Sequence, residues 1–135
     1  RVDVIQNGAF CRRANDQRHG CWLKEAISGQ AGNVVIAAGT TCSADLLALD
    51  GAPLLHLRRF SVLQPHPLSG AFSGEIRLGT LHQPGGNSWP IKGGSMSGNV
   101  FTAFRRVHLS AERSLQGKLL GPRMIRLQGV QITGE

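Results

Sequence analysis

Glycine and proline interrupt this chain so often that only short helices and strands fit between the turns. The 135 residues include eighteen glycines and six prolines, and no tyrosine is present. Turn signals are densest in residues 61–90, which contain the sequences QPHP, SG, SG and PGGN. Between these signals, side chains alternate over residues 76–81, and an apolar stretch resumes at residues 88–91. This stretch therefore predicts an antiparallel hairpin within a strand-rich fold.

The N-terminal part of the chain predicts a hairpin, an irregular arm and a buried strand. Asn7-Gly8 lies between short apolar stretches, which is the strongest local signal of a β-hairpin. Residues 12–32 show no sustained period of 2 or 3.6, so we expect a partly ordered arm with Trp22 and Leu23 anchored to a core. The continuous apolar run at residues 33–38 is typical of a strand that is buried on both faces.

Two short helices are predicted from capping residues and apolar spacing. Residues 40–43 offer N-cap side chains to a helix over residues 43–49, which Gly51 ends. A second helix begins after Ser97 or Asn99 and reaches residue 107, with apolar side chains along one stripe. The stripe consists of Val100, Phe101, Phe104 and Val107.

Two more strands complete the predicted fold. Residues 54–57 read as a strand that ends at the pair Arg58-Arg59. The alternation over residues 122–133 changes phase at Gly129, which predicts a bulged final strand. We expect one α+β domain over residues 1–135, with a mainly antiparallel, partly barrel-like sheet and two short helices.

The composition limits the cellular compartments and the classes of partner that we expect for this chain. The net charge of +7 permits a basic nucleic-acid-associated module, but the arginine pairs fall on separate predicted elements with few aromatic residues between them. The same positive charge is explained at least as well by a basic rim that contacts an acidic partner or a peptide carboxylate. No apolar run is long enough for a membrane helix. The odd number of cysteines, three, without a CxxC pair favours a reduced, cytoplasmic setting.

Residues for independent catalysis are sparse in this sequence. The five histidines form no HExxH or HExxxH pair, and the close pair His19-x-Cys21 gives two metal ligands at best. Cys42 is the best candidate nucleophile, because the first turn of a helix favours a thiolate, although a small residue beside a cap more often packs. We therefore predict no catalytic residue and no metal ligand in this chain, and keep a Cys42-dependent hydrolase as an alternative.

The order of several motifs resembles the TldD/PmbA family. Residues 89–100, WPIKGGSMSGNV, are similar to the family segment in which a strand leads into a helix capped by Gly-Asn. Residues 33–39 and 43–47 are similar to the family pattern NLVI..G..s.eeL, residues 69–76 resemble the stretch before its hairpin, and residues 122–130 resemble its closing strand. The ordered set spans about residues 30–135.

The resemblance implies a role in a zinc-dependent peptidase that acts on unfolded or modified peptides and natural-product precursors. Family members pair a TldD-like metal-bearing subunit, which has an HExxxH helix, with a TldE/PmbA-like partner that lacks it. The remaining metal ligand of the family is a Cys between the Gly-Asn helix and the final strand. Here that segment, VHLSAERSLQGKLLGPRM, has no Cys, and these 135 residues contain no HExxxH.

This chain therefore resembles the non-catalytic partner, with zinc expected in the TldD-like subunit and none in its own residues. It is either a short dedicated subunit or a fragment, because the family's usual N-terminal domain and metal-helix region are missing from it. We expect an extended peptide to be held by β-augmentation at exposed strand edges, with Arg58, Arg59 and Arg105 as substrate contacts.

Overall fold

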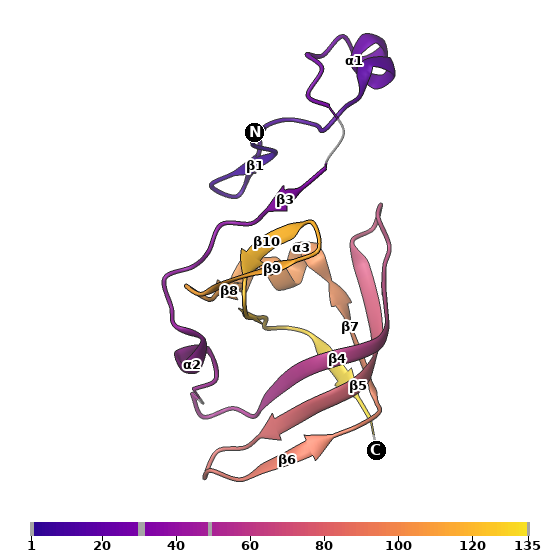
Figure 1. Ribbon diagram of the computed structural model, residues 1–135. Helices are drawn as coiled ribbons and strands as arrows, with labels where there is room; N and C mark the ends of the chain where they lie inside the picture. The colour runs from indigo at the N-terminus through magenta and orange to yellow at the C-terminus, as the bar shows by residue number, and fades with distance from the viewer. Residues whose placement is uncertain (1, 30–31, 49, 135) are drawn as a thin grey trace. The chain divides into compact units, whose positions relative to one another are not determined.

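The computed structural model describes residues 2–29, 32–48 and 50–134, which form many short strands and a few short helices (Figure 1). The chain divides into two compact units, which are described separately. The first comprises Arg1–Ile36 and Leu115–Leu120, and the second comprises Ala37–Ser114 and Gly121–Glu135. The predicted excess of antiparallel strands is confirmed, and the described sheets do not close into a barrel.

The first unit begins with the predicted hairpin. Strands β1 (Ile5–Gln6) and β2 (Ala9–Phe10) pair antiparallel across Asn7 and Gly8. Both turn residues have positive φ, 51° for Asn7 and 77° for Gly8, which is the backbone shape that Asn-Gly adopts with little strain. This local prediction is confirmed because the turn chemistry alone determines it.

The predicted irregular arm contains a helix, α1 (Gln17–Leu23), which periodicity did not reveal. The carboxylate of Asp16 caps it by accepting the His19 N–H at 2.9 Å, and Lys24 ends it in the left-handed conformation. Trp22 is 79% exposed, so its predicted anchoring is wrong, whereas Leu23 is half-buried. The helix was missed because its cap, rather than an apolar stripe, defines it. Gln30 and Ala31 of the expected arm lie outside the described residues.

The predicted buried strand is short and exposed. Strand β3 (Val34–Val35) pairs in parallel with β10 (Leu119–Pro122), which neighbours β9 (Arg113–Gln116) in the same sheet. Val34 and Val35 are nearly half exposed. The expectation of burial on both faces is therefore wrong. An apolar run shows that a strand is hydrophobic, but it does not show whether other residues pack on its two faces.

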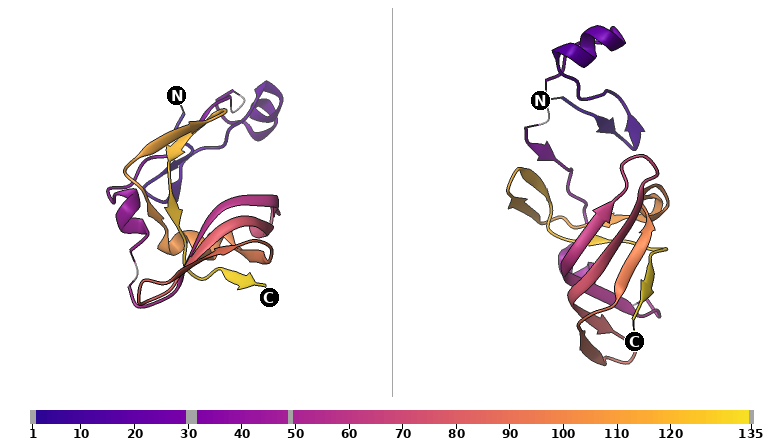
Figure 2. Two further views of the ribbon diagram at one scale, coloured as in Figure 1. Left: turned by 60° about the horizontal axis from the view of Figure 1, so that its bottom comes forward. Right: turned by 90° about the vertical axis from the view of Figure 1, so that its right-hand side faces the viewer.

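The second unit is built on a five-stranded sheet whose central strand is long. Its order is β12-β7-β5-β4, with β6 also paired to β5. All of its pairings are antiparallel, as the two views in Figure 2 allow the reader to follow. The strands are β4 (Leu54–Pro65), β5 (Ala71–His82), β6 (Ser88–Ile91), β7 (Ser95–Asn99) and β12 (Gln131–Thr133).

Strand β4 continues past the arginine pair at which it was predicted to end. Its register against β5 shifts between Leu57 and Arg59 and again before Val62, so the extra residues are absorbed as bulges. The predicted turn at Ser73-Gly74 is also wrong, since both residues lie inside β5. Gly74 suits a strand interior here because a Cβ would meet Leu63 and Phe60 side chains at 3.0 Å.

The hairpin of β5 and β6 is confirmed. Thr80 pairs with Pro90 and His82 with Ser88, across the predicted glycine-rich turn. The Gln83 N–H donates to the Asn87 carbonyl at 2.9 Å, and Gly85 and Gly86 both have positive φ. Glycine is needed at these two positions because other residues are strained there.

The helices of the second unit are shorter than predicted. Helix α2 spans Ser43–Leu46, and α3 (Val100–Ala103) passes into a 3₁₀ turn, η1 (Phe104–Arg106). Asn99 caps α3 by accepting the Phe101 N–H at 2.9 Å, as predicted. The predicted apolar stripe is not the buried face: Phe101 is 65% exposed, and Ala103 is buried instead. Leu49 of the expected first helix lies outside the described residues.

The C-terminal segment contains two strands rather than one bulged strand. Strand β11 (Ile125–Arg126) pairs with β8 (His108–Leu109), whereas β12 pairs with β7. Gly129, with φ of 73°, lies between them. The phase change in the sequence was real, but it marks a change of partner strand and not a bulge.

A glutamate holds the start of α2. The Ser43 N–H donates to both Glu112 carboxylate oxygens, at 2.9 and 3.1 Å, and the Ser43 hydroxyl donates to Oε2 at 2.6 Å. The Ser43 hydroxyl, followed by its N–H, lowers the pKa of Glu112 below its ordinary value. Cys42 occupies the N-cap position itself without a side-chain capping bond.

We expect Glu112→Gln to remove the acid sensitivity of this cap. Because the pKa of Glu112 is lower in the folded chain, its contribution to stability is full above the unfolded pKa and is lost as the pH falls through the folded value. NMR signals of Ser43 should therefore change between about pH 6 and about pH 3 in the wild type and stay nearly constant in the variant. An equal acid response in both proteins would contradict the assignment. Glu75→Gln, an exposed change in β5, is the matched control.

Candidate functional site

An open apolar hollow is the main cavity feature of the second unit. Its volume is about 1160 Å³, larger than the roughly 300–1,000 Å³ typical of small-molecule sites. It lies against one face of the sheet, where Ile76 and Met96 are buried. The apolar lining comprises Leu46, Leu47, Leu54, Leu55, Leu57, Leu81, Ile91, Met124, Ile125, Leu127, Val130 and Ile132. The size and lining suit contact with protein better than with a small ligand.

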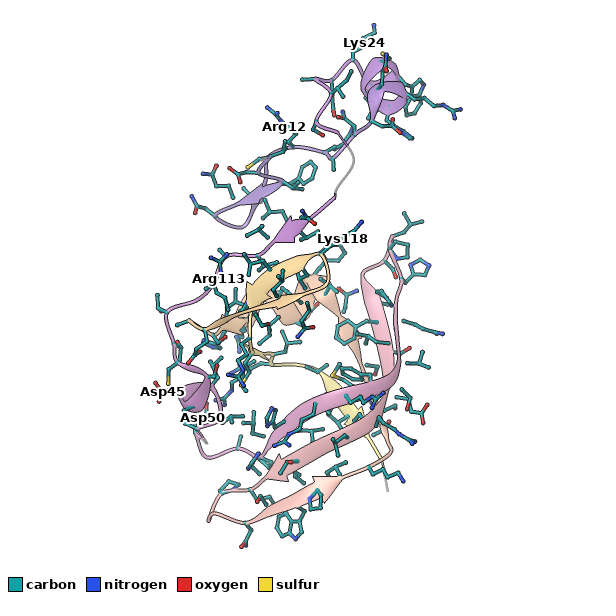
Figure 3. All side chains as sticks on the ribbon, viewed as in Figure 1. Arg12, Lys24, Asp45, Asp50, Arg113 and Lys118 are labelled. Atoms are coloured by element: carbon teal, nitrogen blue, oxygen red, sulfur yellow. The ribbon has the colours of Figure 1, made fainter. Side chains whose placement is uncertain are left out.

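Strand alternation explains why this face is apolar. Leu55 pairs with Leu81 and Leu57 with Gly79, which places alternate residues of β4 and β5 on the same side. His56 and Thr80, which are also paired, fall between these positions, and His56 also lines the hollow. Basic residues stand at the margin of the hollow. Of these, Arg126 donates to Asp50 at 2.9 Å and to the Ala48 carbonyl at 2.9 Å, which fastens the segment after α2. Figure 3 labels Asp50 beside α2.

Apart from the hollow, each of the two units exposes many apolar side chains. Leu46, Ile76, Met96 and Ala103 are the buried hydrophobic residues among those described, whereas twenty large hydrophobic side chains are exposed. The chain exposes 10176 Å². A compact protein of this mass exposes roughly 6,800 Å², and two separate compact units of these sizes expose roughly 8,100 Å² together. The excess of roughly 2,000 Å² is more than the roughly 800 Å² that one partner buries in a protein–protein interface of standard size.

Strand β4 presents a free edge. It pairs with β5 on one side, and within the described residues no strand pairs with its other side. An open edge carries backbone N–H and C=O groups that a further extended segment can pair with. At twelve residues, β4 is long enough to receive such a segment.

The structure places two of the three predicted substrate-binding arginines on this edge strand. Arg58 and Arg59 are exposed and lie at a register shift of β4, whereas Arg105 is exposed in η1. Within the described residues no hydrogen bond or ion pair joins Arg105 to the other two. Charged residues and bulges on an edge strand also discourage unwanted strand pairing, so Arg58 and Arg59 have a second physical role to be tested.

The alternative nucleophile, Cys42, lacks the surroundings of a catalytic thiol. Its Sγ is exposed and makes no hydrogen bond to any described residue, so no general base is positioned beside it. At the start of α2, the N–H and the hydroxyl of Ser43 already donate hydrogen bonds to the Glu112 carboxylate. The geometry therefore does not favour a Cys42-dependent hydrolase.

Metal-ligating residues do not converge in the part of the chain that is described. No group of three or more His, Cys, Asp or Glu side chains there could hold a metal ion. His19 and Cys21, the close pair in the sequence, both lie on α1, and His19 Nδ1 is 2.7 Å from an Asp16 oxygen. The arginine pairs also remain on separate elements: Arg12-Arg13 follow β2, and Arg105-Arg106 belong to η1.

Sequence reasoning missed a pair of stacked histidines. The rings of His56 in β4 and His82 in β5 have centroids 6.4 Å apart and an interplanar angle of 25°. The residues are 26 positions apart in the sequence, so only the strand register brings them together. A prediction that residues 54–65 and 71–82 form one long antiparallel hairpin would have placed His56 and His82 close together.

The second unit thus combines a mainly antiparallel sheet with an apolar hollow and a free strand edge. The model of the PmbA/TldA metallopeptidase C-terminal domain matches residues 1–134, and the chain belongs to this family. The resemblance noted in the motif order is thus confirmed. Comparisons with curated proteins and with solved structures gave no match.

None of the helices in the described residues is long and apolar enough to cross a membrane.

Proposed function

We propose that this chain is a non-catalytic component of a TldD/TldE-type zinc metallopeptidase, in which it helps to form the cleft for a peptide substrate. The observation that carries the proposal is the total surface that the chain exposes, which exceeds that of two separately compact units by roughly 2,000 Å² and includes the apolar hollow. Leaving the apolar part of this surface in water is unfavourable, since burial of apolar area contributes about 25 cal/mol per Å². A TldD-like subunit is the partner that the family points to.

The metal motif supports assigning catalysis to that partner. In the family resemblance, zinc is held by an HExxxH helix and by a Cys in the segment before the final strand. The corresponding segment here, VHLSAERSLQGKLLGPRM, has no Cys. Its residues form β8, β9 and β10 instead of a metal-binding group. Zinc in the partner, a cytoplasmic heterodimer and a role in peptide maturation or natural-product biosynthesis belong to the same proposal.

The free edge of β4 supports binding of an extended peptide. A peptide added to this edge would form backbone hydrogen bonds, and its alternate side chains would face the two sides of the sheet. Arg58 and Arg59 lie on the same strand and are exposed, so they can meet carboxylates of the peptide. Arg105 is a further proposed contact from η1.

The proposal is tested by purifying the chain alone and together with a TldD-like subunit. We expect a stable complex with zinc-dependent peptidase activity that a chelator abolishes, and no activity of the chain alone. Peptidase activity of the isolated chain that resists a chelator would contradict the proposal.

Replacing both Arg58 and Arg59 shows whether they contact the peptide or only protect the edge of β4 from unwanted strand pairing. In the complex, Arg58→Gln with Arg59→Gln should raise KM for an acidic peptide about threefold to tenfold, because exposed charge pairs contribute only modestly. Arg77→Gln, an exposed change on β5, should leave KM unchanged. Aggregation of the double variant with an unchanged KM would instead show that the arginines only protect the strand edge.

A further inference from the structure

Three basic side chains meet where β4 and β5 pair. Leu54 is opposite His82 and His56 is opposite Thr80, so the two histidines are diagonal neighbours on one face of the sheet. Their rings are stacked, with centroids 6.4 Å apart. Arg58 follows His56 by two residues on the same strand.

Arg58 places a positive charge near the two histidine rings without a counter-charge. The pKa of His56 is lowered first by burial, then by the Arg58 guanidinium and by His82. No carboxylate contributes to this effect. The described residues form no ion pair with any of the three side chains.

The inner nitrogen of His82 adds a second, independent observation. Its Nε2 is buried and has no hydrogen-bond partner among the described residues. Buried polar atoms without a partner are uncommon in folded proteins, and because this atom is out of contact with solvent, an anion reaches it only when the His82 ring turns.

We propose that His56, His82 and Arg58 form a binding site for an oxyanion, either a carboxylate or a phosphate group. Imidazole N–H groups and a guanidinium donate hydrogen bonds to such oxygens, and the guanidinium can do so through two parallel bonds. A metal cation suits the site less well, because Arg58 would repel it and two histidines provide only two ligands. This site does not depend on the proposed peptidase role, although an acidic peptide on the edge of β4 would place a carboxylate near it.

Histidine ring NMR signals of the full chain test the site. Inorganic phosphate, acetate, a short acidic peptide and Zn²⁺ are titrated separately at constant ionic strength. We expect at least one of these anions to shift the signals of His56 and His82, while the signals of His66 and His108 stay unchanged. Tighter binding of phosphate would identify a phosphate site, and tighter binding of acetate or the peptide a carboxylate site.

Arg58→Gln should weaken the anion affinity about tenfold, because a charged hydrogen-bond donor is lost. Arg77→Gln, also exposed and on the neighbouring strand, should not weaken it. Since Arg58 is exposed, this variant should fold even if a change at His82 does not. The proposal would be overturned if no anion shifts His56 and His82, if all histidines shift equally, or if only Zn²⁺ gives a response.

Discussion

Replacing Gly39 by alanine should destabilise the second unit by roughly 3–5 kcal/mol, the largest effect that we expect from a single change. A Cβ at this position would clash with the Leu109 carbonyl oxygen and would lie 2.7 Å from the carbonyl carbon. Both are backbone atoms, so the contact cannot be relieved by a side-chain rotation. Overpacking costs roughly 1–3 kcal/mol and loss of a buried hydrogen bond roughly 1–3 kcal/mol.

The hydrogen bonds around Gly39 explain why the chain cannot simply move away. The Gly39 N–H donates to the Ser110 carbonyl at 3.0 Å, and Ser110 is fully buried. The Ser110 hydroxyl donates to the Glu112 carbonyl at 2.8 Å and accepts the Met124 N–H at 3.0 Å. A shift at Gly39 would therefore disturb three segments of the second unit together.

Thermal and denaturant unfolding check this prediction. Gly39→Ala should lower Tm by more than about 10 °C, because 1 kcal/mol shifts Tm by roughly 4–8 °C in a unit of this size. Gly32→Ala is the matched control, since a Cβ there meets nothing within 4 Å and its φ is not positive. The control should change stability by less than about 0.5 kcal/mol. Equal stability of the two variants would show that the Gly39–Leu109 contact is wrong.

A charge placed in the apolar hollow should strongly weaken the binding of the partner. Ile132 lines the hollow on β12 and is 45% exposed in the chain alone. If a TldD-like subunit covers this surface, Ile132→Asp would bury an unpaired carboxylate in the interface, which costs several kcal/mol. We expect the Kd of the complex to rise at least about 100-fold.

The control for this variant is an equally drastic change away from the hollow. Leu68 is 88% exposed in the turn between β4 and β5 and does not line the hollow. Leu68→Asp should leave the Kd within about twofold. Circular dichroism of both variants confirms that the chain is folded before binding is measured. A Kd that is unchanged by Ile132→Asp would exclude the hollow from the interface.

Local turn and cap chemistry made part of the fold predictable. Asn7-Gly8 and Gly85-Gly86 formed the predicted turns, and Asn99 formed the predicted cap, because each depends on residues only a few positions away. Helix α1 was missed although its Asp16 cap is equally local, since its seven residues carry no apolar stripe.

Features that depend on distant residues were not predictable from one sequence. The length of β4, the change of partner strand at Gly129 and the His56–His82 pair all follow from strand register. The exposure of Val34 and Val35 was also missed. The hydrophobicity of a strand does not show whether other residues of the chain cover it. Arg58 and Arg59 were predicted as a pair and do share one edge strand, but the bulges around them were not foreseen.

Hydrogen–deuterium exchange tests most directly whether a partner covers the apolar hollow. The exchange of the chain alone is compared with that of the chain mixed with a TldD-like subunit. Our account predicts at least about tenfold slower exchange at the backbone of residues 54–57 and 123–133, which line the hollow, and little change in the turn at residues 83–87. Unchanged exchange across residues 54–57 and 123–133 in a confirmed complex would contradict it.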